Sequence, residues 1–167
     1  MDIISHGVWG SIGFGRKSRK SFWIAFFFGV APDLFSFGIF TASTWLGLVS
    51  GPDWSAGPPD SNLIPQYVHA LYDITHSLIV FLAAFILVWI VRKKPLYELG
   101  AWGLHILLDI PTHSARFFPT PFLWPISDFH IDGISWGNPL IFIPNVTLLA
   151  GFSFYFFFLK RRRKGRK

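Results

Sequence analysis

The chain has 167 residues, the length of a single domain, and no cysteine, which excludes disulfides and Cys-ligated zinc or iron–sulfur centres. Half of its residues are hydrophobic (51%), 19% are aromatic and only 14% are charged, which is too apolar for an ordinary soluble domain. The net charge is +6, but no nucleic-acid-binding motif accompanies the basic residues. We therefore expect membrane lipids as partners and no nucleic acid.

The first third of the chain contains two apolar runs. Residues 1–14 are too short to span a bilayer, which predicts a half-helix, and they lack the features of a cleaved signal peptide. The run 22–49 is too long for one simple span, and Pro32-Asp33 interrupts it, so we expect a helix broken at that dipeptide. Residues 50–65 are rich in Gly, Pro and Asp and are predicted to form a loop.

The rest of the chain contains three more apolar runs. Residues 68–91 give the clearest prediction of a spanning helix, 96–112 return across the bilayer, and 139–159 form the last predicted span. Between the last two, residues 114–138 are rich in proline and aromatic side chains and predict an outer segment.

The basic clusters set the expected orientation. Lys and Arg gather at 16–20, 92–94 and 160–167, each next to an apolar run, which is the positive-inside pattern of a multi-pass inner-membrane protein. The sequence thus predicts an all-α integral membrane protein with about four spanning helices in a single domain, 1–159. Residues 160–167 are predicted to be a basic cytoplasmic tail that contacts anionic headgroups.

The segment 103–113 carries three titratable side chains in an otherwise apolar stretch. His105, Asp109 and His113 are spaced i, i+4, i+8, which places them on roughly one face of a helix. Pro111 should kink or end that helix near His113. Because an ionisable side chain inside a membrane is costly, this face predicts a functional site.

The height of each polar residue follows from its number of helical residues from the nearest basic cluster. By this estimate, polar residues of four segments lie at one height, between mid-bilayer and the outer face. Zinc is commonly held by imidazole nitrogens and carboxylates, and Mn²⁺ or Fe²⁺ accept similar ligands. The sequence therefore predicts a divalent metal site, with Zn²⁺ as the expected ion. The predicted ligands are His6, Asp33, His76, His105 and Asp109.

Each ligand also has a simpler interpretation. His6 could be an interfacial residue, Asp33 could cap a helix that begins at the next residue, and His76 could hydrogen-bond between helices. Asp73 and His113 are better suited to orient ligands or to relay protons, so they are the candidate catalytic bases. Asp73 could equally cap its helix, and His113 could lie at the outer interface.

The order of these motifs resembles the YdjM-like family of predicted membrane-bound metal-dependent hydrolases. The matching elements are His6, Pro32-Asp33, Thr75-His76-Ser77, and His105 with Asp109 and Thr112. Residues 121–125 also resemble a Pro-rich segment of that family, so the likeness covers about residues 1–125. The family often has a His-Arg-Gly-x-Thr-His-Ser run, whereas residues 71–77 lack that His and Arg.

The resemblance implies a hydrolase, and the predicted depth of the site suits a lipid-like or amphiphilic ester or phosphodiester attacked by a metal-activated water. A different class fits part of the pattern: an ion or proton transporter with Asp33, Asp73 and Asp109 as carriers. A third interpretation is a structural membrane protein whose core a metal stabilises.

Overall fold

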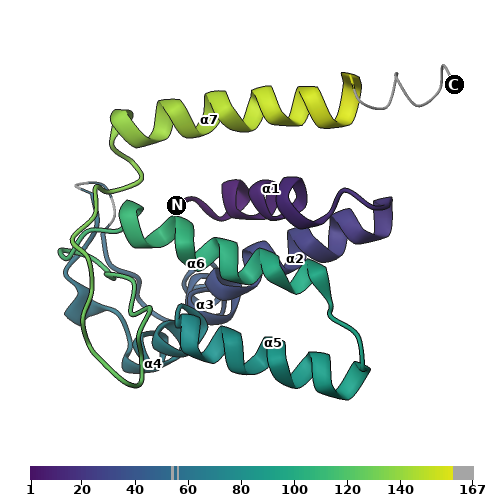
Figure 1. Ribbon diagram of the computed structural model, residues 1–167. Coiled ribbons are helices and arrows are strands. Elements are labelled where there is room, and N and C mark those ends of the chain that lie inside the picture. The colour runs from purple at the N-terminus through teal and green to yellow at the C-terminus, as the bar shows by residue number, and fades with distance from the viewer. Residues whose placement is uncertain (54, 56, 160–167) are drawn as a thin grey trace, which may run out of the picture.

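The computed structural model describes residues 1–53, 55 and 57–159 (Figure 1). This part of the chain contains seven α-helices and no strand, so the predicted all-α class is confirmed there. The predicted basic tail lies outside the described residues. The helices are α1 (Ile3–Phe14), α2 (Arg19–Ser36), α3 (Gly38–Trp45), α4 (Gln66–Thr75), α5 (Leu78–Arg92), α6 (Gly100–Thr112) and α7 (Pro139–Ser153). Short 3₁₀ turns, η1 (Ser61–Leu63) and η2 (Tyr97–Leu99), precede α4 and α6, and the π-helical segment η3 (Phe154–Leu159) extends α7.

Helices α1, α2 and α6 form the inner group of the molecule, because each packs extensively on the other two. The contact between α1 and α2 is very close: a Cβ on Gly29 would lie 2.5 Å from the carbonyl oxygen of His6. The remaining long helices lie outside this group, α7 beside α1 and α5 beside α6 (Figure 1).

Helix α2 runs through Pro32-Asp33, so the predicted break at that dipeptide is wrong. A proline removes only one hydrogen bond of the helical ladder, and here Pro32 is buried in the inner group. The chain bends by 65° a few residues later, at Phe37, where α2 ends and α3 begins.

The predicted span 68–91 is also divided, into α4 and α5, which meet at a bend of 58°. Helix α4 ends at Thr75, and the hydroxyl of Ser77 caps α5 by accepting from the backbone N–H groups of Ile79 and Val80. This cap stabilises a new helix start directly after His76. The bend turns the His76 side chain into the protein interior, where it is fully buried.

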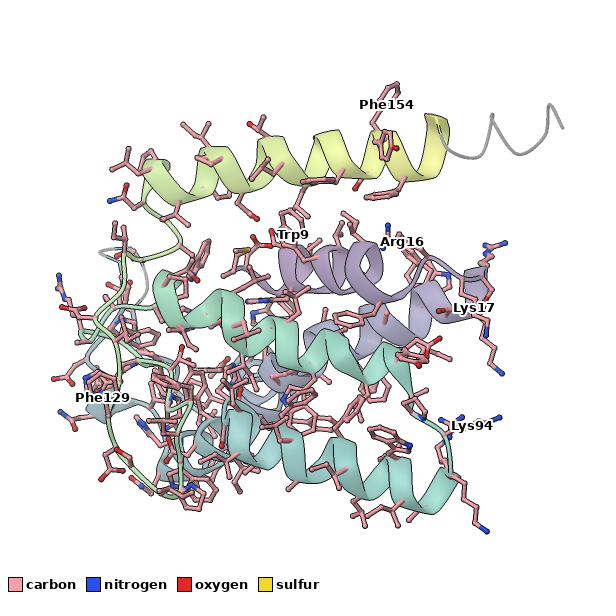
Figure 2. The ribbon with its side chains drawn as sticks, viewed as in Figure 1. Trp9, Arg16, Lys17, Lys94, Phe129 and Phe154 are labelled. Carbon is pink, nitrogen blue, oxygen red and sulfur yellow. The ribbon has the colours of Figure 1, made fainter. Side chains whose placement is uncertain are left out.

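Basic side chains gather at one end of the helical group (Figure 2). Figure 2 shows Arg16, Lys17 and Lys94 at one end of the molecule and Phe129, in the predicted outer segment, at the opposite end. The guanidinium of Arg16 lies 4.5 Å from the ring centre of Phe156, so the end of α7 also lies at the basic end. The described parts of the predicted loop, 50–53 and 57–65, contain no α-helix, as expected, and residues 114–138 contain none either.

One described helix is long and apolar enough to cross a membrane: α7 together with the start of η3 (Pro139–Phe156). The number rises to three if each bent pair, α2 with α3 and α4 with α5, counts as one span. Helix α6 has only 13 residues. The apolar exterior and the length of α7 are compatible with a membrane location, and the four-span bundle stays a prediction.

Candidate metal centre

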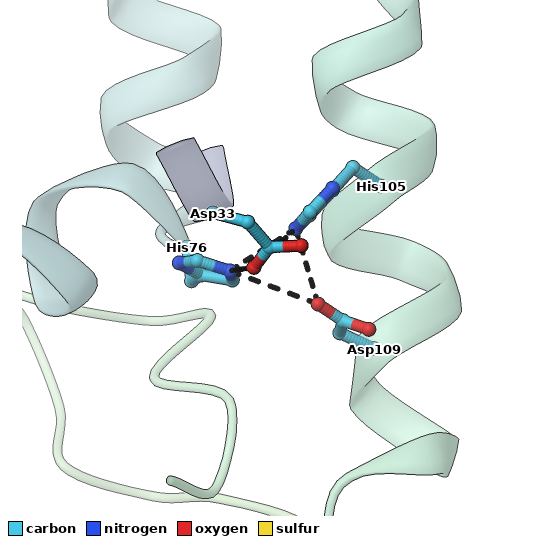
Figure 3. A group of neighbouring side chains, drawn as sticks. All are labelled: Asp33, His76, His105 and Asp109. Atoms are coloured by element: carbon cyan, nitrogen blue, oxygen red, sulfur yellow. Dashed lines mark hydrogen bonds and ion pairs between the residues drawn. The ribbon is translucent and has the colours of Figure 1, made fainter. Parts of the chain in front are cut away.

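Four of the five predicted ligands meet inside the inner group (Figure 3). Asp33 comes from α2, His76 from the break between α4 and α5, and His105 and Asp109 from one face of α6, as their spacing predicted. One nitrogen or oxygen atom from each of these side chains lies within 4.8 Å of the other three. The two histidines and Asp109 are fully buried, whereas the Asp33 side chain is 19% exposed.

The distances between these donor atoms are those of a coordination shell. Ligands at about 2.0–2.1 Å from a tetrahedral ion lie about 3.3 Å from one another. His76 Nε2 lies 3.0 Å from His105 Nε2, 3.5 Å from Asp33 Oδ1 and 3.7 Å from Asp109 Oδ2. His105 Nε2 lies 3.8 Å from Asp33 Oδ1 and 3.1 Å from Asp109 Oδ2. A small cation at the centre could therefore contact all four atoms with little rearrangement.

The hydrogen bonds of the two imidazoles leave Nε2 free for an ion. His105 Nδ1 lies 2.7 Å from the carbonyl oxygen of Gly29, and a carbonyl can only accept, so Nδ1 carries the proton. His76 Nδ1 likewise lies 3.2 Å from the carbonyl oxygen of Tyr72. With Nδ1 as the donor on each ring, the two Nε2 atoms face each other across 3.0 Å, a contact that a positive charge between them would stabilise.

The carboxylates point to the same conclusion. Asp109 Oδ2 is fully buried and has no hydrogen-bond donor in the described part of the chain. A buried carboxylate is costly unless positive charge balances it, and a second carboxylate, that of Asp33, faces the same histidines. The Asp33, His76, His105 and Asp109 group could therefore bind a metal ion, which would neutralise both acids.

His6, the fifth predicted ligand, adjoins this group without belonging to it. Its ring stacks on that of His105, with centroids 3.7 Å apart, and its Nε2 lies 2.9 Å from the other oxygen of Asp109, Oδ1. Helix α1 brings His6 there through the close backbone contact with Gly29.

His113 lies at the end of α6, where Pro111 was expected to end the helix. Its Nε2 is 3.5 Å from Asp109 Oδ1, and the amino group of Met1 contacts both residues. Burial lowers the pKa of the His113 imidazole to about 4, so the ring is neutral near pH 7.

Asp73, the other candidate base, lies outside the metal centre. It is half-buried and lines a pocket of about 310 Å³, together with polar residues of the outer segment. His69 and His130 also line this pocket. Tyr72 separates it from the metal centre, since one side of its ring stacks on His76 at 3.8 Å.

Tyr72 is the functional neighbour that the sequence did not single out. Its hydroxyl donates to the carbonyl oxygen of Phe118 at 3.0 Å and lies 2.8 Å from His113 Nδ1. Its position four residues before His76, on the same helical face, was the available signal.

No protein-family model, curated protein or solved structure matches the chain. The resemblance to the YdjM-like family thus stays a prediction from the motifs. The geometry of the four donor atoms is the main guide to function.

Proposed function

We propose that the protein is a membrane-bound metal-dependent hydrolase that acts on a lipid-like or amphiphilic ester or phosphodiester. The observation that carries this proposal is the close approach of the four donor atoms: each histidine Nε2 lies 3.0 to 3.8 Å from the other Nε2 and from the oxygens of Asp33 and Asp109. Zn²⁺ is the ion proposed for this mixture of imidazole and carboxylate ligands, and Mn²⁺ or Fe²⁺ would be accepted by the same atoms.

Each residue of the centre has a task that its contacts support. Asp33 and Asp109 supply negative charge, and the two histidines supply Nε2 lone pairs whose direction is fixed by hydrogen bonds at Nδ1. These residues would hold a divalent ion, which would supply Lewis-acid chemistry: polarisation of the scissile bond and a lower pKa of a bound water. Asp33 is the only partly exposed member of the group, so substrate and water would approach beside it.

The surroundings suit an amphiphilic substrate. Large apolar side chains of α5 and α7 are exposed, and a bilayer would cover them. The segment 114–138 is held over the end of α6 by backbone hydrogen bonds from Gly133, Ile134 and Trp136. We propose that this segment is a lid. The pocket beside it, lined by Asp73, would receive the polar part of the substrate.

The test is the metal content of the detergent-purified chain beside its His105→Ala variant, followed by a screen of esters and phosphodiesters. We expect the wild type to retain a divalent metal, and both metal and hydrolysis to be lost in His105→Ala. His130→Ala is the control for metal content alone, because His130 lies outside the metal centre, is exposed, and has its Nδ1 3.2 Å from the carbonyl oxygen of Asp128.

The outcomes separate the three interpretations. A wild type that binds no metal contradicts the hydrolase and favours a transporter with carboxylate carriers. A metal that is retained by the wild type, with no hydrolysis dependent on His105, favours a structural core. In that case His105→Ala lowers stability and changes nothing else.

A further inference from the structure

The carboxylate of Asp109 has two oxygens that face different groups. Oδ2 faces the metal centre, with His105 Nε2 at 3.1 Å and His76 Nε2 at 3.7 Å. Oδ1 points away from that centre toward His6 Nε2 at 2.9 Å and His113 Nε2 at 3.5 Å. A second set of donor atoms therefore gathers around the same side chain.

The second set has the features of a cation site. His6 is 1% exposed, its Nδ1 has no hydrogen-bond partner within the described residues, and its Nε2 faces Asp109 Oδ1. His113 Nδ1 lies 3.0 Å from the carbonyl oxygen of Phe118, to which it can only donate, so its Nε2 presents a lone pair to Asp109. A lone pair that faces a carboxylate oxygen is repelled unless a positive charge lies between them.

A positive group does lie there. The amino group of Met1 contacts Asp109 Oδ1 and is 3.2 Å from His113 Nε2. A metal ion held by these atoms would have to displace this amino group.

We propose that Asp109 bridges two divalent cations. One is held by Asp33, His76, His105 and Asp109 Oδ2, and the second by His6 Nε2, His113 Nε2 and Asp109 Oδ1. The distances of 2.9 and 3.5 Å from the histidines to Oδ1 match the spacing of about 3.3 Å between ligands of one small ion. This inference rests on the proposed function, because it takes the first centre to hold a metal.

The assignment gives His6 and His113 specific roles. His113 is then a ligand and not a catalytic base, because the lone pair on its Nε2 is directed at the ion. Tyr72 becomes a positioning residue, since its hydroxyl and the carbonyl of Phe118 hold the His113 ring from the Nδ1 side. His6, which did not belong to the first group, becomes a ligand of the second.

The experiment uses the full chain in detergent, stripped with a chelator and reloaded with Mn²⁺. We expect about two Mn²⁺ ions per wild-type chain and an electron paramagnetic resonance spectrum of a spin-coupled pair. His6→Ala and His113→Ala should each hold about one ion with the spectrum of an isolated Mn²⁺. His130→Ala should keep both ions and the coupled spectrum.

The possible results separate this inference from the proposed function. A wild type that takes up no Mn²⁺ overturns both. A single, uncoupled ion in the wild type overturns the second site and leaves the first. This measurement needs no variant, so misfolding of a variant cannot affect the result. If His113→Ala keeps a coupled pair and changes only the pH profile of hydrolysis, His113 is a base and the bridged arrangement is wrong.

Discussion

The inner and outer helices of this protein distribute their side chains in opposite ways. Helices α1, α2 and α6 bury serine, histidine, aspartate and threonine, whereas α5 buries no residue and α7 buries only Asn145. The outer helices instead expose large apolar side chains such as Ile90 and Leu140. Polar groups thus gather inside, and the apolar groups face outward, the arrangement that a lipid environment favours.

The comparison teaches that different contacts stabilise the two regions. The inner helices approach one another closely at glycine residues, and their hydrogen bonds orient the side chains of the metal centre. Small changes of side-chain volume or polarity there should therefore lower the stability strongly. The outer helices have few contacts with the rest of the protein and should tolerate substitution. Matched substitutions in the two regions test this difference.

The largest effect is expected at Gly29. An alanine Cβ would lie 2.5 Å from the backbone oxygen of His6 and 3.1 Å from Gly7 Cα, and backbone atoms cannot move aside as a flexible side chain would. We expect Gly29→Ala to lower the free energy of unfolding by about 1–3 kcal/mol. The Gly29 carbonyl also orients His105, so metal affinity should fall by about 10–100-fold. Unfolding in SDS, followed by tryptophan fluorescence, and metal titration measure the two effects.

Gly151→Ala in α7 is the control for the same change in an outer helix. Among the described residues, no atom beyond the neighbouring backbone of α7 lies within 4 Å of a Cβ at Gly151, and alanine is favoured over glycine in a helix by roughly 0.5–1 kcal/mol. We expect this variant to be unchanged or slightly stabilised, with normal metal binding. Equal destabilisation by the two variants would remove the distinction between inner and outer helices.

A smaller effect is expected at Asn145, the buried residue of α7. Its Oδ1 accepts from Trp9 Nε1 at 2.8 Å, and its Nδ2 donates to Ser5 Oγ at 2.9 Å. Asn145→Ala should cost about 1 kcal/mol of unfolding free energy, the usual size of interhelical hydrogen bonds in membranes. Thr147→Ala is the matched control, because Thr147 is exposed and its hydroxyl donates only to Ile143 of its own helix. If both variants lose the same stability, Asn145 does not anchor α7 to α1.

The convergence of Asp33, His76, His105 and Asp109 could be predicted from the sequence. Helical rise and the positions of the basic clusters fix the height of each residue, and a charged side chain at that height needs a partner. The spacing of His105 and Asp109 also fixed their common face.

The bends could not be predicted, because each depends on local contacts. Proline indicated a break at Pro32, but a single lost hydrogen bond does not end a helix whose other contacts persist. The apolar run 68–91 concealed the division at His76, although Ser77 is a favoured N-cap residue and was the available signal. The split of donor atoms between the two oxygens of Asp109 depends on how α1 packs on α6, and no local pattern encodes that packing.

The smallest effect is expected at the basic end of the inner group, where the polar contacts approach the surface. The Ser21 hydroxyl donates to Glu98 Oε1 at 2.6 Å and lowers the pKa of Glu98 below its ordinary value of 4.5. A lowered pKa means that the stabilisation is present above the unfolded value and is lost as the pH falls through the folded value. Ser21→Ala should therefore be slightly less stable than the wild type at neutral pH, and the difference should shrink below about pH 4.5. Unfolding curves across this range measure it, and in a Glu98→Gln background the pH dependence of the difference should vanish. A stability difference that is the same at every pH would instead assign the effect to the packing of the buried Ser21 side chain and not to its hydrogen bond with Glu98.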